Sequence, residues 1–315
     1  MEKREIGKSG IKVKPFAFGG NVFGWTIDEN ESFKILDEFV DKGFDLIDTA
    51  DVYSRWVPGH KGGESETIIG KWLKKSGNRD KVAIATKVGK PMEGKKGLSK
   101  QYITAAVEAS LKRLQTDYID LYQSHDDDKE TPLLETMETF TGLIKQGKVR
   151  AIGASNFDGA RFKEALQVSK ENGLAAYECL QPEYNLYARE HYEKELEPIC
   201  RERNIGVISY YSLASGFLTG KYRSENDLSQ SSRGAGVKNM LNPRGYKILA
   251  ALDKVAAEYN VTPASVALAW VMARPGITAP IASATSVKQL DELIKAADLH
   301  LNSTAIDLLN NASKY

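Results

Sequence analysis

The chain has 315 residues, 42% of them hydrophobic, with 43 Lys and Arg against 42 Asp and Glu and a formal charge of +1. This balance argues against a nucleic-acid partner, which needs a basic excess, and no apolar run approaches the ~18 residues that cross a membrane. Because the first ten residues lack the apolar core of a secretory signal and there are only two cysteines, Cys179 and Cys200, the sequence predicts a cytoplasmic, reduced protein.

Along the chain, short apolar runs alternate with amphipathic stretches of helical period. The runs predict eight strands at 15–20, 44–49, 82–87, 118–125, 149–155, 178–181, 205–210 and 279–283. The stretches between them predict helices at 31–42, 64–74, 100–114, 133–145, 159–171, 190–203 and 287–296. Strands that alternate with helices pair in parallel, so eight units predict an α/β fold, a (β/α)8 TIM barrel.

Several segments depart from this repeat. Residues 3–13, with a Gly-Lys-Ser-Gly turn, predict a β-hairpin ahead of the first barrel strand. The polar, Gly- and Ser-rich stretch 213–246 is too long for an ordinary connection and predicts a functional loop. Extra helices are expected at 247–259, 263–274 and 303–311. Nothing in the composition marks a second domain, so we expect one domain over residues 1–315.

Polar side chains follow the second, third and fourth predicted strands at the point where each strand ends. Asp48 lies 39 residues before Lys87, which lies 38 residues before His125, so each interval is one strand–helix unit. In a barrel of this kind the catalytic groups come from the carboxyl ends of several strands. We therefore expect these three side chains to lie together, with Tyr53 folding back over them.

Each of these residues alone also has an ordinary structural role, such as a capping carboxylate, a solvated lysine, a buried histidine or an aromatic at the rim. Together they fit a general acid beside a carbonyl group, without a nucleophile or a metal. A neighbouring ammonium favours the tyrosine anion, so Lys87 is expected to lower the pKa of Tyr53, and Asp48 to hold Lys87 in place. A neutral His125 imidazole can orient a substrate carbonyl.

Later strand ends carry groups suited to a nicotinamide. Ser155, Asn156 and Gln181 can pair with a carboxamide, and the Tyr210 ring can stack on a flat heterocycle. Helix capping is an equally good explanation for the Ser-Asn pair. The small residues at 283–286 precede a helix and suit a phosphate, with capping again as the alternative. No glycine-rich dinucleotide fingerprint follows any strand.

Long motifs in a fixed order resemble the aldo-keto reductases. They are GFDLIDTADVY at 43–53, Lys87 at a strand end, YIDLYQSH at 118–125, GKVRAIGASNF at 147–157 and SGFLTGK at 215–221, and the likeness runs from residue 4 to about 296. The resemblance implies a cytosolic barrel that uses NADPH, less often NADH, to reduce aldehydes and ketones without a metal. It also implies that Tyr53 donates the proton, that Lys87 and Asp48 tune it, and that His125 orients the carbonyl.

The resemblance further assigns cofactor contacts. Ser155, Asn156 and Gln181 would bind the nicotinamide amide, Tyr210 would stack on its ring, and the long loop would hold the pyrophosphate. The full set of expected contacts is Gly20, Asn21, Asp48, Ser155, Asn156, Gln181, Tyr210, Leu213, Ser215, Gly216, Lys221, Arg233, Ser283, Thr285, Lys288 and Gln289. Many family members carry a Lys or Arg at the position of Ser283 or Gln289; here Lys288 or Arg233 would supply the charge for a 2′-phosphate, so NADPH is expected, with NADH as the alternative.

The substrate mouth is expected to be rimmed by Phe23, Trp25, Trp56 and Asp126, and the short segment after residue 298 indicates an open mouth for a small carbonyl or sugar-like substrate. Two other functions are weighed against reduction. One is a regulatory NADPH-binding module resembling potassium-channel β subunits, with little turnover. The other is a metal-dependent hydrolase or isomerase barrel, which the presence of a single strand-end histidine disfavours. The oligomeric state is left open.

Overall fold

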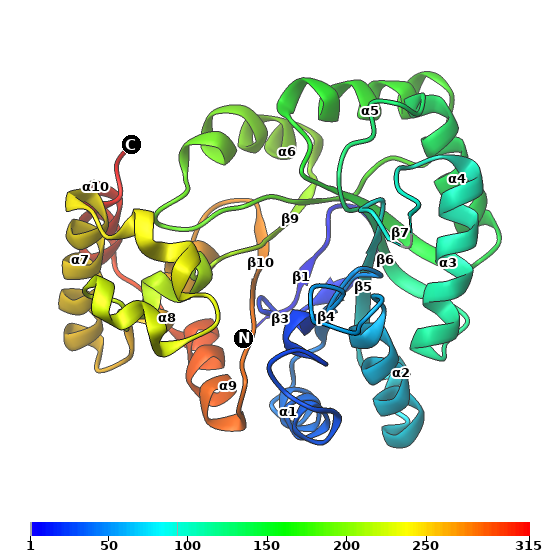
Figure 1. Ribbon diagram of the computed structural model, residues 1–315. Helices are drawn as coiled ribbons and strands as arrows, with labels where there is room; N and C mark the ends of the chain where they lie inside the picture. The colour runs from blue at the N-terminus through cyan, green and yellow to red at the C-terminus, as the bar shows by residue number, and fades with distance from the viewer. Residues whose placement is uncertain (1, 93) are drawn as a thin grey trace.

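In the computed structural model, which describes residues 2–92 and 94–315, eight parallel strands close into a barrel surrounded by helices (Figure 1). The strand order around the barrel is β10-β3-β4-β5-β6-β7-β8-β9, which confirms the predicted (β/α)8 barrel. The strands are β3 (Ala17–Gly19), β4 (Leu46–Asp48), β5 (Ala83–Val88), β6 (Ile119–Ser124), β7 (Val149–Ser155), β8 (Cys179–Gln181), β9 (Gly206–Ser209) and β10 (Ile277–Ala282).

The helices alternate with the strands as the amphipathic periods predict. They are α1 (Glu29–Asp41), α2 (Glu64–Ser76), α3 (Lys100–Leu114), α4 (Leu133–Lys145), α5 (Gly159–Glu171), α6 (Glu197–Arg203), α7 (Pro243–Tyr259), α8 (Pro263–Met272), α9 (Val287–Ile294) and α10 (Ser303–Ala312). Side-chain caps set several starts, because Ser99 and Asp158 each accept from the N–H three residues on. The helix expected at 190–203 is instead a π-helix, Tyr192–Leu196, followed by α6.

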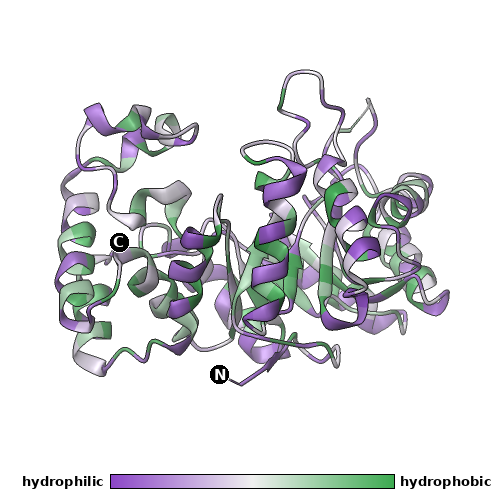
Figure 2. Cartoon of the chain, turned by 90° about the horizontal axis from the view of Figure 1, so that it is seen from below, coloured by the Kyte–Doolittle hydropathy of each residue, from purple (hydrophilic) through white to green (hydrophobic). Residues whose placement is uncertain are grey.

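Two hydrophobic cores lie on the two sides of the barrel wall. Alternate strand residues such as Leu46, Leu121 and Ile208 fill the barrel interior. The hairpin of β1 (Arg4–Glu5) and β2 (Lys12–Val13) adds Ile6, Ile11 and Val13 to this interior cluster. The larger core lies between the strands and the helices, whose apolar faces turn towards the sheet (Figure 2).

The long segment after β9 is not a structureless loop. It contains three short 3-10 helices, Ala214–Thr219, Glu225–Gln230 and Gly234–Met240, before α7 begins at Pro243. Helix α7 starts four residues earlier than expected because the Asn242 side chain caps it and proline occupies its first turn. The segment lies at the end of the barrel where the carboxyl ends of the strands meet.

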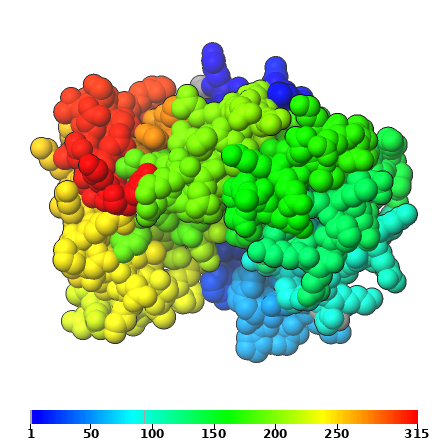
Figure 3. All heavy atoms as spheres, turned by 90° about the horizontal axis from the view of Figure 1, so that it is seen from above, coloured from blue at the N-terminus to red at the C-terminus, as the bar shows by residue number. Residues whose placement is uncertain are grey.

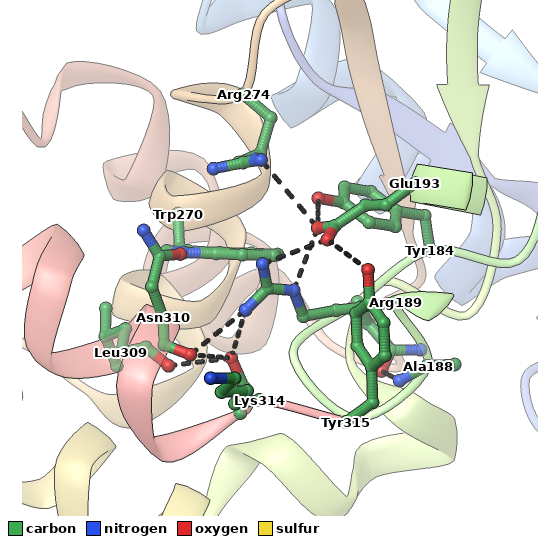
Figure 4. A network of polar contacts seen from close by, with 12 residues as sticks. Tyr184, Ala188, Arg189, Glu193, Trp270, Arg274, Leu309, Asn310, Lys314 and Tyr315 are labelled. Carbon is green, nitrogen blue, oxygen red and sulfur yellow. Dashed lines mark hydrogen bonds and ion pairs between the residues drawn. The ribbon is translucent and has the colours of Figure 1, made fainter. Parts of the chain in front are cut away.

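Hydrogen bonds around the Arg189–Glu193 ion pair join residues 310–315 to the segment after β8 (Figure 4). Arg189 donates two hydrogen bonds to the Glu193 carboxylate, at 2.8 and 3.0 Å, and one to Ser313 Oγ at 2.8 Å. The Tyr184 hydroxyl donates to Glu193 at 2.7 Å, and Tyr315 does so at 3.2 Å. This network fixes the residues that follow α10 against the segment that leaves the barrel at Gln181.

Candidate active site

The expected polar residues come together at the carboxyl ends of the strands. Sheet register places Asp48 beside Ala85, and the next inward residue of β5, Lys87, beside Gln123 of β6. The His125 main chain continues this pairing, donating to Val88 O at 2.8 Å. Asp48 and Lys87 are fully enclosed and His125 is 7% exposed. Regular strand pairing therefore builds the site that the spacing in the sequence predicts.

The Lys87 ammonium is the centre of the cluster. It donates to Asp48 Oδ2 at 2.7 Å, to Thr49 O at 2.7 Å and to the Tyr53 hydroxyl oxygen at 3.0 Å. Burial disfavours the ammonium, but Asp48 and Tyr53 outweigh burial, so the pKa of Lys87 is raised. Lys87 thus stays a cation in contact with the phenol oxygen.

Burial raises the pKa of Tyr53 to about 12, against the opposing effect of Lys87, and the Asp48 carboxylate adds to the rise. The expected net lowering is therefore wrong for this arrangement. The Lys87 cation is shared with Asp48, whose Oδ2 lies 3.4 Å from the Tyr53 hydroxyl and disfavours a second negative charge. The phenol is a protonated, hydrogen-bonding group at neutral pH.

His125 lies beside Tyr53, with the two ring centroids 6.0 Å apart. Burial, together with the nearby charges of Lys87 and Lys90, holds the pKa of His125 well below its ordinary value. The imidazole is consequently neutral at neutral pH, as expected. Its Nδ1 is buried without a hydrogen-bond partner among the described residues. The ring can present one donor and one acceptor to a small molecule.

A chain of hydrogen bonds links the amide and hydroxyl residues of β7, β8 and β9 to this cluster. Gln181 Nε2 donates to Asp48 Oδ1 at 2.8 Å, and Ser155 Oγ donates to Gln181 O at 2.8 Å. Asn156 Nδ2 donates to His125 O at 2.8 Å and its Oδ1 accepts from the Tyr210 hydroxyl at 2.9 Å. The four expected nicotinamide residues therefore adjoin one another and the acid–base cluster.

The start of the long loop has an unusual backbone. Ala214, Ser215 and Gly216 have φ values of 49°, 56° and 93°, in the left-handed region that only glycine adopts freely. The Ala214 N–H donates to Tyr211 O at 2.6 Å and the Gly216 N–H donates to Leu213 O at 2.9 Å, so these residues form a tight turn that is closed by its own main-chain hydrogen bonds. Lys221 lies beside this turn, since a Cβ built at Gly216 meets its Nζ at 3.5 Å. Leu213 immediately precedes the turn and is half-buried.

Arg233 of the long loop contacts residues that follow the first barrel strand. Its guanidinium lies 5.3 Å from the Trp25 ring centroid. With the Asn21 amide oxygen turned towards it, Arg233 donates at 2.7 Å, while the Asn21 nitrogen lies 2.7 Å from Ser283 Oγ. Neighbouring Gly20 is buried, and its carbonyl accepts from Ser65 Oγ at 2.7 Å. Loop, first strand end and last strand end are joined here.

At the start of α9 the expected phosphate residues cap the helix. Ser286 accepts from the Gln289 N–H at 3.3 Å, and Gln289 Oε1 accepts from the Thr285 N–H and hydroxyl at 2.9 Å each. Lys288 is exposed in the first turn. Helix capping therefore accounts for the present contacts of Ser286 and Gln289. Thr285 and Lys288 are exposed, so an anion could reach them.

Aromatic side chains gather beside the acid–base cluster, and Figure 3 shows a hollow between the yellow and the light-blue parts of the chain. Trp25 and Trp56 meet edge to face at 5.5 Å, and Trp56 lies 6.0 Å from the Tyr53 ring. Phe23, expected at this rim, is instead fully buried and stacks on Phe18, because the chain after β3 turns its side chain into the core. Asp126 is half-buried, 3.6 Å from Lys90 Nζ.

Two polar residues at the site have no expected role in the sequence. Gln123 is fully buried, and its amide has no hydrogen-bond partner in residues 2–92 and 94–315. Its place two residues before His125 on one strand was a usable signal, because alternate strand residues face the same side. Asp51, between Asp48 and Tyr53, is 1% exposed. Its burial had no signal in the sequence, because it lies in an irregular turn.

Other features of the described part of the chain bear on the class of protein. None of its helices is long and apolar enough to span a membrane. Within the same residues, no group of His, Cys, Asp and Glu side chains could hold a metal ion. Cys179 and Cys200 are both buried free thiols.

Comparison with known proteins agrees with this geometry. The model of the aldo/keto reductase family matches residues 15–314. The chain is 36% identical to the uncharacterized oxidoreductase YrpG of Bacillus subtilis, over 99% of this chain and 95% of that protein, and 35% identical to the aldo-keto reductase YhdN of Bacillus subtilis, over 96% and 91%. It is also 34% identical to a probable voltage-gated potassium channel subunit beta of Arabidopsis thaliana, over 95% and 92%. The chain therefore belongs to the aldo/keto reductase family.

Proposed function

We propose that this protein reduces an aldehyde or ketone to an alcohol with a nicotinamide cofactor, reversibly, and that Tyr53 supplies the proton. The observation that carries the proposal is the protonated Tyr53 phenol, 3.0 Å from the Lys87 ammonium and beside a neutral His125 at the mouth of the barrel. A carbonyl oxygen that gains negative charge during reduction needs such a donor and a nearby positive charge.

The protein's own residues take distinct parts in this reaction. His125, which is neutral and buried, orients the carbonyl oxygen towards the Tyr53 hydroxyl. As the oxygen gains charge, Tyr53 gives up its proton, and Lys87 stabilises the phenolate that forms. Asp48 holds Lys87 through the 2.7 Å ion pair, and Gln181 in turn holds Asp48. Trp25 and Trp56 would contact the substrate body.

The residues present fit a nicotinamide dinucleotide, which supplies a hydride when it is bound. Lys221 lies beside the tight turn at 214–216, and its ammonium would pair with a pyrophosphate. Ser155, Asn156 and Gln181 would pair with the carboxamide, and Tyr210 would support the ring. Arg233, which lies at Asn21 beside Ser283, and the exposed Lys288 of α9 are cations that would pair with a 2′-phosphate, so we infer that NADPH is preferred to NADH.

Substitution of Tyr53 by phenylalanine tests the proposal. Tyr53→Phe keeps the ring that packs against Trp56 but removes the proton donor. We expect oxidation of NADPH with a panel of aldehydes, ketones and sugars to fall by at least about 100-fold, the usual contribution of general acid catalysis. Quenching of tryptophan fluorescence by NADPH should stay unchanged. Reduction by the variant at the parental rate would contradict the assigned mechanism.

A second function has a specific observation in its favour, namely the 34% identity to a protein named as a probable potassium channel subunit beta. A binding module of that kind would hold the nucleotide with little turnover. The same carbonyl panel separates the two functions, because steady turnover supports the reductase. A nucleotide that co-purifies with the protein, together with no reduction of any carbonyl, would favour the module. For the reductase we propose a small-molecule carbonyl substrate and a cytoplasmic location.

A further inference from the structure

Asp51 is a buried carboxyl group directly behind the proposed acid–base cluster. It lies in the turn between Asp48 and Tyr53, and its main-chain N–H donates to Lys87 O at 3.3 Å. Its side chain is 1% exposed, and no side chain among the described residues donates a hydrogen bond to either carboxyl oxygen. Buried carboxylates in proteins are nearly always paired with a cation or hydrogen-bonded, so this environment is unusual.

Arg113, the cation that acts most strongly on Asp51, is already paired with another carboxylate. Glu66 of α2, which is fully buried, accepts from Arg113 Nε of α3 at 2.6 Å and from Thr86 Oγ1 at 2.6 Å. Asp51 and Glu66 thus lie near the same guanidinium, and the hydrogen bond from Arg113 goes to Glu66. The Lys87 ammonium likewise gives its three hydrogen bonds to other acceptors.

The remaining group that faces Asp51 offers no charge. Tyr122 of β6 is fully buried, and its hydroxyl has no partner in the described part of the chain. Glu66, Arg113, Lys87 and Tyr122 are the titratable groups that act on Asp51 from α2, α3, β5 and β6. Burial, followed by the Glu66 charge, raises the pKa of Asp51 to about 8, against the opposing effects of Arg113, a main-chain hydrogen bond from Val52, and Lys87.

We propose that Asp51 is held as a neutral carboxylic acid behind Lys87 and acts as a positioning residue that keeps a second negative charge away from the Lys87–Tyr53 pair. This inference rests on the proposed function for its catalytic consequence, although the protonation of Asp51 does not. With Asp51 neutral, Asp48 is the carboxylate that balances the Lys87 charge. When Asp51 ionises, it adds negative charge near Lys87 and disfavours the Tyr53 phenolate.

The protonation of Asp51 has a signature in stability. A carboxyl whose pKa is raised by folding, here from 3.8 to about 8, keeps its proton in the folded state while the unfolded chain loses it. Its contribution to stability is therefore fully present below pH 3.8, falls as pH rises, and levels off above pH 8. The substitution Asp51→Asn places a side chain there that copies the shape of the neutral acid and cannot titrate.

The first experiment compares the melting temperatures of the wild type and Asp51→Asn between about pH 4.5 and 9. We expect the wild-type value to fall relative to the variant as pH rises to about 8 and then to stay constant. Asp120→Asn is the matched control, because Asp120 is equally buried but accepts from Arg79 at 2.8 Å and Arg150 at 2.6 Å. That variant should be less stable than the wild type at neutral pH. A wild-type advantage over Asp51→Asn that grows with pH would overturn the proposal.

A direct titration covers the case in which Asp51→Asn fails to fold. In the wild-type protein labelled with 13C at aspartate carboxyl carbons, one resonance should titrate near pH 8. If every aspartate resonance has completed its titration below about pH 6, the proposal is wrong.

The second experiment measures the effect on catalysis. Alcohol oxidation needs the Tyr53 phenolate as base, so ionised Asp51 should slow it. We expect single-turnover oxidation by Asp51→Asn to match the wild type within about twofold near pH 7 and to exceed it at least about threefold near pH 9.5. A ratio that does not change with pH would contradict the positioning role. If neither protein turns over any substrate, the proposed function fails, while the melting and titration results still decide whether Asp51 is neutral.

Discussion

Removal of the Lys87 charge tests the structural centre of the site. In Lys87→Met the Asp48 carboxylate, 1% exposed, loses its 2.7 Å ion pair and keeps only the Gln181 amide as a strong donor. Breaking a buried pair by removing one partner costs about 3–5 kcal/mol, because the other charge is left uncompensated. Asp48→Asn should lower the free energy of unfolding by a similar amount, because it leaves the fully buried ammonium of Lys87 without its counter-charge.

The double variant Asp48→Asn/Lys87→Met separates this charge effect from simple loss of packing. It removes both charges, so it should be less destabilised than the sum of the single variants by at least about 2 kcal/mol. Urea unfolding followed by circular dichroism gives the four free energies of unfolding that the cycle needs. Costs that add within about 0.5 kcal/mol would refute the argument that the two residues act as a buried ion pair.

Two further predictions concern helix packing and pH. Gly70→Ala in α2 should destabilise the protein by about 1–3 kcal/mol, because a Cβ there would lie 2.0 Å from the main-chain oxygen of Arg113. This clash outweighs the higher helix propensity of alanine. Gly142→Ala in α4, whose Cβ would meet no described atom within 4 Å, should instead stabilise it by about 0.5–1 kcal/mol, as measured by thermal unfolding. Since burial raises the pKa of Tyr53 to about 12, kcat for carbonyl reduction should not fall with Tyr53 ionisation between about pH 7 and 9. The measurement uses Asp51→Asn, which lacks the ionisation proposed near pH 8. A steep loss of reduction by that variant across the range would show that the phenol titrates far lower.

Much of this fold is determined locally. The strands lie in short apolar runs, and helices α3, α4 and α5 begin and end where their amphipathic periods predict. The spacing of Asp48, Lys87 and His125 by one strand–helix unit each is enough to bring them to one end of a parallel barrel, because every strand runs in the same direction. The long motifs around these residues also identify the family.

Only the tertiary structure decided the electrostatics. The sequence predicts that Lys87 lowers the pKa of Tyr53, but enclosure and the shared Asp48 raise it, and neither burial depth nor sharing is readable from spacing. Likewise Phe23 reads as a rim aromatic and is a core residue, since one turn after β3 directs its ring inward. The sequence assigns no role to Asp51, yet packing of α2 and α3 against the strands leaves it buried without a side-chain partner among the described residues. Periodicity and spacing determine which residues meet, because they depend on neighbours along the chain. Protonation depends on the desolvation and charge contributed by residues far apart in sequence, and so it is decided only when the fold is complete.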